Sequence, residues 1–138
     1  MPQIYLCTMG ANLAPETNFA KAREQIARYG QAHYSRAIYT RPVAMESNLD
    51  FLNALFLLET ELDCETLKSH FNAIEISLGR DRADPLSSQK DRPMDIDILG
   101  SLTHKDVWQF VPSYLESVIP TLKPMAINLQ QQLDFQHE

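Results

Sequence analysis

Two aspartates one residue apart are the part of this sequence best suited to chemistry. Asp95 and Asp97 alternate with apolar residues over 94–99, and in a β-strand alternate residues share one face. Both carboxylates would therefore point the same way, and they repel each other unless a cation lies between them. Mg²⁺ suits that place, because it favours carboxylate oxygens together with substrate phosphates. A solvated outer face of an edge strand is the alternative, and the spacing alone does not decide.

Cations gather in the segment just before these aspartates. It holds four of the chain's 12 Lys and Arg residues, namely Arg80, Arg82, Lys90 and Arg92. Three aspartates leave the segment only slightly positive, so its charge alone does not identify a phosphate site. Arg92 lies three residues before Asp95, however, which brings cations and metal ligands to one end of a strand. Phosphoryl transfer needs both, because metal ions neutralise the phosphates and arginine forks hold their oxygens.

A second candidate lies in the most apolar run of the chain, residues 51–62. Asn53 is a polar residue inside this run, and a buried amide must find hydrogen-bond partners. It could bind a neighbouring loop, or it could bind the edge of a flat heterocycle. Phe51 lies on the same strand face and could stack on such a ring, although aromatic residues at strand spacing more often belong to the core.

The remaining candidates are weaker. Glu75 and Asn72 share a face of a predicted helix, and such a pair is usually solvated. The four histidines form no ligand cluster, and the sequence has neither a P-loop nor a G-x-S-x-G motif. P-loop kinase chemistry and nucleophilic catalysis therefore have no support.

Hydrophobic periodicity and the residues that end each run predict the elements that position these side chains. We predict strands over 3–9, 32–40, 51–62 and 94–99, and helices over 15–29 and 64–78. The stretch 80–93 is a long polar loop, and such a loop is either a lid over a site or disordered, with the lid slightly favoured. After Gly100 the pattern weakens: an edge strand over 107–111 and helices over 113–119 and 124–133 are the candidates.

The order β-α-β-β-α-β predicts an α+β fold with a four-stranded antiparallel sheet and both helices on one face. With 138 residues, 44% of them hydrophobic, and no linker or repeat, we expect one domain over 1–138.

Composition excludes several classes of protein. The net charge of −6 argues against a nucleic-acid surface, and no stretch approaches the roughly 18 apolar residues of a membrane span. The N-terminus does not resemble a secretory signal. Cys7 and Cys64 lack metal-ligand spacing, so we interpret them as reduced core residues of a cytoplasmic protein rather than a disulfide.

Together these motifs resemble 6-hydroxymethyl-7,8-dihydropterin pyrophosphokinase, a family of folate synthesis. The order and spacing match from about residue 3 to residue 100. Each motif is loose, but the set is fairly specific, above all the aspartate pair with its upstream arginine. The motifs are Gly10-Ala-Asn-Leu13, Tyr39-Thr-Arg-Pro42, Asp50-Phe-Leu-Asn-Ala54, Glu75 followed by Gly79-Arg80, and Arg92-x-x-Asp95-Ile-Asp97-Ile-Leu99.

The resemblance implies a ferredoxin-like fold, with helices mainly on one face of the sheet, and transfer of pyrophosphate from ATP to the hydroxymethyl oxygen of the pterin. Two Mg²⁺ ions would bind Asp95 and Asp97. The implied catalytic residues are Arg80, Arg82, Arg92, Asp95 and Asp97. The implied pterin-binding residues are Thr40, Pro42, Val43, Met45, Phe51 and Asn53. The implied ATP-binding residues are Asn72, Glu75, Arg80, Arg92 and Ile96.

The chain departs from the family pattern on its C-terminal side. Ser113 and Tyr114 follow Val111-Pro112 where the family has a histidine, and residues 115–120 are shorter and lack the family's arginine and phenylalanine. The loop before Arg92 also has no tryptophan. These changes would remove a phosphate ligand, a cation and one wall of the pterin site.

Two functions are therefore open. The first is a Mg²⁺-dependent pyrophosphokinase with full, reduced or altered activity, acting on ATP and a pterin, with a monomer favoured. The second is a catalytically impaired relative that binds a pterin or nucleotide or serves as an interaction module. The retained aspartate pair and Arg92 favour the enzyme.

Overall fold

The computed structural model describes residues 2–41, 49–81 and 91–136. These residues form five strands, three α-helices and two short 3₁₀ helices. The elements, in chain order, are β1 (Gln3–Ala11), α1 (Pro15–Ile26), β2 (Gln31–Tyr34), β3 (Ile38–Thr40), β4 (Phe51–Thr60), α2 (Cys64–Ser77), β5 (Asp95–Ser101), η1 (Val107–Phe110), η2 (Ser113–Val118) and α3 (Ile119–Gln136).

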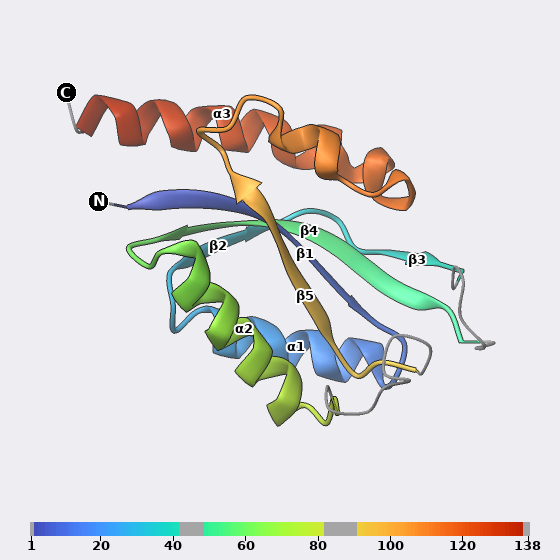
Figure 1. Cartoon of the computed structure of the whole chain (residues 1–138). Coiled ribbons are helices and arrows are strands. Elements are labelled where there is room, and N and C mark those ends of the chain that lie inside the picture. Colours follow the sequence, from blue (N-terminus) through green and yellow to red (C-terminus); the bar gives the residue numbers. More distant parts are fainter. Residues whose placement is uncertain (1, 42–48, 82–90, 137–138) are drawn as a thin grey trace.

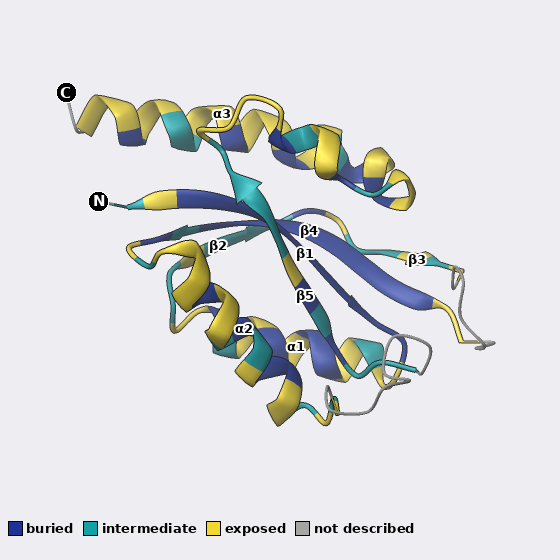
Figure 2. Ribbon diagram, in the orientation of Figure 1, coloured by how far each residue is buried: buried dark blue, intermediate teal, exposed yellow. Residues whose placement is uncertain are grey.

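The strands form one antiparallel sheet in the order β2-β4-β1-β5, with β3 also paired to β4. β1 and β4 are central and are buried along almost their whole length (Figure 2). The continuous apolar run of β4 explains this, because a strand covered on both faces needs apolar residues on both. The predicted α+β fold with an antiparallel sheet is confirmed.

The predicted strand over 32–40 is wrong in one respect, because it is two strands. β2 and β3 pair with opposite halves of β4, and Ser35 lies in the gap between them. The N–H of Ser35 donates to the carbonyl of Leu55 (2.9 Å), and the N–H of Leu55 donates to Ser35 Oγ (2.9 Å). The hydroxyl thus replaces a backbone carbonyl, and the pairing breaks without an unpaired buried amide.

Helices α1 and α2 pack on one face of the sheet, as predicted (Figure 1). Asp63 caps α2 by accepting the N–H of Thr66 (2.8 Å), and Gly79 ends it in a left-handed conformation. The apolar spacing within each helix matches the residues that it buries. These are Phe19, Ala22 and Ile26 in α1, and Leu67, Phe71 and Ile74 in α2.

The C-terminal segment covers the opposite face of the sheet (Figure 1). Its apolar residues pack on Ile4, Leu6, Leu55 and Leu57 of the central strands. The edge strand predicted over 107–111 is wrong, since these residues form η1 and its end. The candidate helix over 113–119 is mostly the 3₁₀ helix η2, and the candidate over 124–133 is part of the longer α3.

Two smaller expectations have mixed outcomes. Cys7 and Cys64 are both free thiols, as expected, but only Cys7 is buried. The core assignment of Cys64 is wrong because it begins α2 on the solvent side. In the described residues, no helix is both long enough and hydrophobic enough for a membrane span.

Candidate active site

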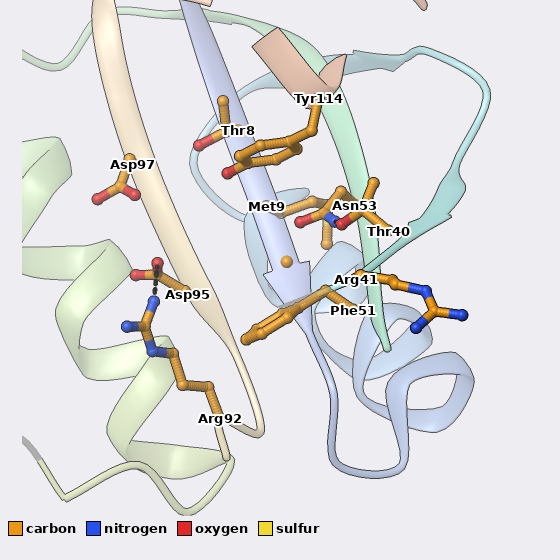
Figure 3. Close-up of a pocket in the computed structure, with 11 residues that line it drawn as sticks. Thr8, Met9, Thr40, Arg41, Phe51, Asn53, Arg92, Asp95, Asp97 and Tyr114 are labelled. Atoms are coloured by element: carbon orange, nitrogen blue, oxygen red, sulfur yellow. Dashed lines mark hydrogen bonds and ion pairs between the residues drawn. The ribbon is translucent and has the colours of Figure 1, made fainter. Parts of the chain in front are cut away.

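A pocket of about 120 Å³ lies on the sheet face that the C-terminal segment covers. It is smaller than the roughly 300–1,000 Å³ of a typical drug-sized ligand site, so it suits a ring-sized part of a substrate. Six of the predicted site residues line it: Thr40, Phe51, Asn53, Arg92, Asp95 and Asp97. Figure 3 shows their side chains around the hollow, with the two aspartates on β5 at one end.

The register of the sheet brings these residues together. Gly10 of β1 lies opposite Asp95 on one side and Asn53 on the other, and Thr8 lies opposite Asp97. Adjacent strands are about 4.8 Å apart, so the Asp95 and Asn53 backbones lie roughly 10 Å apart across Gly10. Gly10 has no side chain to fill this space, and a Cβ there would lie 2.5 Å from Asn53 Oδ1. Asp95, Gly10 and Asn53 thus form a row across three strands, and the glycine leaves a hollow between the charged side chain and the amide.

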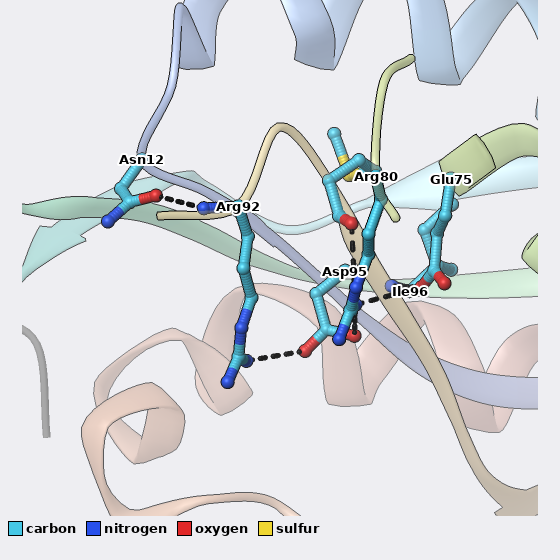
Figure 4. A network of polar contacts seen from close by, with 7 residues as sticks. Asn12, Glu75, Arg80, Arg92, Asp95 and Ile96 are labelled. Carbon is cyan, nitrogen blue, oxygen red and sulfur yellow. Dashed lines mark hydrogen bonds and ion pairs between the residues drawn. The ribbon is translucent and has the colours of Figure 1, made fainter. Parts of the chain in front are cut away.

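Two arginines neutralise Asp95 (Figure 4). Arg80 Nη1 donates to Asp95 Oδ1 (2.7 Å), and Arg92 Nη1 donates to Asp95 Oδ2 (3.2 Å). The exposed fractions of the Arg80 and Arg92 side chains are only 10% and 20%. The predicted convergence of cations and carboxylates is thus a partly buried network, in which Coulomb interactions are stronger than in bulk water.

Glu75 is a fully buried member of the same network. Its Oε2 accepts the N–H of Ile96 (2.7 Å) and lies 3.6 Å from Arg80 Nη1. Our expectation of a solvated Glu75 is wrong, because the carboxylate binds the outer edge of β5 to α2. Asn72, one turn earlier on α2, is half-buried and does not line the pocket.

The Asn53 amide has a structural partner within the sheet and also borders the pocket. The side chain is 5% exposed, and Nδ2 donates to Thr40 Oγ1 (2.5 Å). The amide therefore joins β4 to β3, and it also borders the pocket. The guanidinium carbon of Arg92 lies 5.9 Å from the centre of the Phe51 ring, a cation–π distance.

Sequence reasoning missed Asn12, which anchors the backbone of Arg92 (Figure 4). Its Oδ1 accepts the N–H of Arg92 (2.6 Å), and its Nδ2 donates to Asp91 Oδ1 (2.9 Å). The N–H of Asn12 also donates to the carbonyl of Arg92 (3.0 Å). An asparagine in the turn just after a predicted strand was the available signal, but it did not identify a partner 80 positions away.

Thr8 and Tyr114 also line the pocket and were not predicted. Thr8 is a polar residue two positions before Gly10 in an apolar strand, which is a usable signal. Tyr114 comes from η2, where no periodicity points to it. Partial burial raises the pKa of its hydroxyl, and the negative charges of Asp95 and Asp97 raise it further.

Four predicted site residues lie outside the described residues: Arg82, Pro42, Val43 and Met45. Among the residues that the structure does describe, no three His, Cys, Asp or Glu side chains gather into a metal site. Asp95 and Asp97 are two carboxylates at one pocket end. This donor set fits Mg²⁺, which binds one or two carboxylates and completes its shell with waters and substrate phosphates.

Comparison with known proteins identifies the family of the chain. The family model for 7,8-dihydro-6-hydroxymethylpterin-pyrophosphokinase matches residues 6–123. Curated relatives from two strains of Porphyromonas gingivalis are each named 2-amino-4-hydroxy-6-hydroxymethyldihydropteridine pyrophosphokinase. Each is 34% identical over 143 aligned positions, which cover 91% of this chain and 97% of the relative. The chain therefore belongs to the 7,8-dihydro-6-hydroxymethylpterin-pyrophosphokinase family and is a pyrophosphokinase.

Proposed function

We propose that the chain catalyses Mg²⁺-dependent transfer of pyrophosphate from ATP to 6-hydroxymethyl-7,8-dihydropterin, a step of folate synthesis. The observation that carries the proposal is the row Asp95-Gly10-Asn53 across three strands. This row gives the pocket a charged end that suits phosphates and an amide end that suits a ring. Gly10 lies between them and has no side chain to fill the space. Membership of the family supports this chemistry.

Asn53 and Phe51 would hold the pterin. Asn53 uses one N–H on Thr40, and within the described residues its amide oxygen and second N–H have no partner. An amide with one donor and one acceptor left can bind the complementary edge of a heterocycle. Phe51 would stack on the ring, and Pro42, Val43 and Met45 would form a further wall.

The other end of the pocket would hold the phosphates. Arg80, Arg82 and Arg92 would donate to phosphate oxygens, since guanidinium forks match their geometry. Asp95 and Asp97 would hold two Mg²⁺ ions, which when bound neutralise the phosphate charge. Arg92 lies between Asp95 and the Phe51 ring, so it is placed to bind the group in transfer. Of the other residues implied for the nucleotide, Asn72 would contact it, while the buried Glu75 and Ile96, which bind each other, would position β5 beside it.

The reaction would be an in-line displacement. The hydroxymethyl oxygen of the pterin attacks the β-phosphorus of ATP, the bond from that phosphorus to the bridging oxygen of AMP breaks, and the hydroxyl proton passes to solvent. AMP leaves, and the pyrophosphoryl group stays on the pterin. Catalysis rests on positioning and on charge neutralisation, and one domain over 1–138 acting as a monomer would supply both.

The test is AMP release from ATP, hydroxymethyldihydropterin and Mg²⁺, with the pterin diphosphate measured in parallel. We expect both products from the wild type and a loss of at least about 100-fold in Asp97→Ala, because metal ligation contributes several kcal/mol to transition-state stabilisation. Asp106→Ala, an exposed aspartate beside η1, is the matched control and should retain full activity. No AMP above background from the folded wild type would refute the proposal.

Ser113 favours a second candidate, a relative that binds its ligands without turnover. It begins η2 at the point where the resemblance implies a histidine, and it is exposed. The same assay separates the two candidates. Binding of an ATP analogue with Mg²⁺ but without release of AMP from ATP would identify the non-catalytic form.

A further inference from the structure

We infer that Asn12 is a positioning residue for the transfer, because it holds the backbone of Arg92 and so keeps the guanidinium at the phosphate end of the pocket. This inference rests on the proposed function, in which Arg92 binds the group in transfer. Asn12 does not line the pocket, so its effect on the reaction would pass through Arg92. Figure 4 shows the Asn12 amide against the Arg92 backbone, with the guanidinium directed at Asp95.

Arg92 lies outside β5, where the pairing of the sheet ends. The ladder between β1 and β5 ends at Gly10 and Asp95, and the same register continued would set Asn12 opposite Pro93. Proline has no N–H to donate to a ladder. The backbone N–H and carbonyl of Arg92 therefore need partners other than a regular strand pair, and β5 alone does not fix the position of Arg92.

Asn12 supplies these partners. Its Oδ1 accepts the N–H of Arg92 (2.6 Å), and its own backbone N–H donates to the Arg92 carbonyl (3.0 Å). The N–H of Leu13 adds a longer bond to the same carbonyl (3.3 Å). The Asn12 amide is oriented by a second bond, from Nδ2 to Asp91 Oδ1 (2.9 Å). Asn12 is only 3% exposed, so water competes little for these hydrogen bonds.

The turn that carries Asn12 is itself held by α1. Asn18 Nδ2 donates to the carbonyl of Leu13 (2.8 Å), and α1 begins directly after this turn. The anchor of Arg92 is thus tied to β1 on one side and to α1 on the other. From this fixed backbone the Arg92 side chain reaches Asp95 Oδ2 (3.2 Å). Phosphoryl transfer depends on such positioning of charged groups.

The experiment is a double-mutant cycle of Asn12→Ala and Arg92→Ala with two readouts. These are the Kd of a non-hydrolysable ATP analogue with Mg²⁺, measured by titration calorimetry, and the kcat and KM of AMP release. We expect Asn12→Ala to lower kcat about tenfold or more and to raise the Kd about threefold or more, because a small misplacement of a catalytic group is costly. In the Arg92→Ala background the same substitution should change either readout by less than about twofold, as is typical of residues that act as a unit.

Asn18→Ala is the matched control, because it removes a buried asparagine whose side chain binds Leu13 of the same turn rather than Arg92. It should lower the melting temperature but leave kcat and the analogue Kd within about twofold of the wild type. The paired exchange of Asn12→Asp with Asp91→Asn keeps an acceptor for the Arg92 N–H and lets the second hydrogen bond form in the opposite direction. It should keep kcat within about threefold of the wild type.

Other outcomes would overturn the inference. Equal losses from Asn12→Ala with and without the Arg92 guanidinium, or the same loss of kcat in Asn18→Ala, would show that Asn12 only stabilises the turn. An exchange variant as weak as Arg92→Ala would exclude the role of the Arg92 N–H contact, even if Asn12→Ala did not fold. Because the binding cycle needs no turnover, a wild type that binds the analogue but releases no AMP refutes only the proposed function. A folded wild type that binds no analogue refutes both.

Discussion

Gly10 matters because of what it leaves open between Asp95 and Asn53. We predict that Gly10→Ala weakens pterin binding about tenfold and lowers the free energy of unfolding by about 1–3 kcal/mol, since the new methyl would meet the Asn53 side chain at 2.5 Å and displace the amide. Gly30→Ala is the control, because its Cβ would overlap the backbone oxygen of Glu59. It should lower the melting temperature and leave the pterin Kd unchanged. Equal pterin affinity in Gly10→Ala and the wild type would contradict the prediction.

Glu75 allows a second test at the residue scale. Glu75→Ala leaves the Ile96 N–H and the Arg80 guanidinium without this partner, and breaking a buried ion pair costs about 3–5 kcal/mol. Glu75→Gln keeps an acceptor for the Ile96 N–H and should cost less. Urea denaturation measures both free energies of unfolding. If the two variants were equally stable, the hydrogen bond to β5 would have no energetic role.

The residues differ in how far the sequence predicts them. Asp95 and Asp97, like Phe51 and Asn53, are paired by two-residue alternation, which requires no knowledge of the fold. The contacts of Asn12 depend instead on chain segments that meet only in the folded protein. No local pattern encodes such a meeting, so its position at the site could not be derived.

At the scale of elements, the start of α2 provides a pH-dependent prediction. The Thr66 N–H donates to the Asp63 carboxylate and lowers its pKa. The folded state therefore binds fewer protons than the unfolded state, and the cap stabilises the protein above the ordinary aspartate pKa. This contribution is lost as the pH falls through the lower, folded pKa.

Thermal melts of Asp63→Ala test this cap. We expect a lower melting temperature than in the wild type at neutral pH, by a few degrees at most, and a difference that shrinks as the pH falls below about 4. Asp63→Ser, which also caps helices, is the control and should melt close to the wild type. A difference that did not change with pH would argue against the carboxylate cap.

The helices and strands were predicted best where the hydrophobic pattern of the sequence is long. β4 and α2 each carry an uninterrupted pattern, and their bounds differ from the predicted ones by at most two residues. The break between β2 and β3 was missed because a serine hydroxyl replaces a backbone carbonyl there. The strand propensities of the residues do not reveal that a side-chain hydroxyl accepts a hydrogen bond in place of the backbone.

For the whole molecule, we predict a metal-dependent gain in stability on nucleotide binding. A ligand at 100 times its Kd stabilises the folded state by about 2.7 kcal/mol, or roughly 5–10 °C in melting temperature for a chain of this size. An ATP analogue with Mg²⁺ should produce such a shift. Replacing Mg²⁺ with EDTA should remove most of it, and so should Asp97→Ala. An equal shift without the metal would argue against binding through the two aspartates.

The sheet and its first helical layer followed from the sequence, but in the second layer only part of α3 did. The segment from 107 to 118 forms the two 3₁₀ helices, and Pro120 and Pro124 lie in the first turns of α3, so this part of the chain has no clear helical period to detect. Its buried residues are recognisable only against the sheet face that they cover. Tyr114 was missed for the same reason.

That second layer has a consequence for how the protein is made. The face formed by Ile4, Leu6, Leu55 and Leu57 is synthesised well before the segment that covers it. A nascent chain stopped before residue 107 would already carry Asp95, Asp97 and Asn53, yet it would expose the uncovered apolar face of the sheet. Such a surface recruits chaperones or aggregates on the ribosome. Protection from aggregation and the last pocket side chain, Tyr114, therefore arrive together, when the segment from residue 107 onward is synthesised.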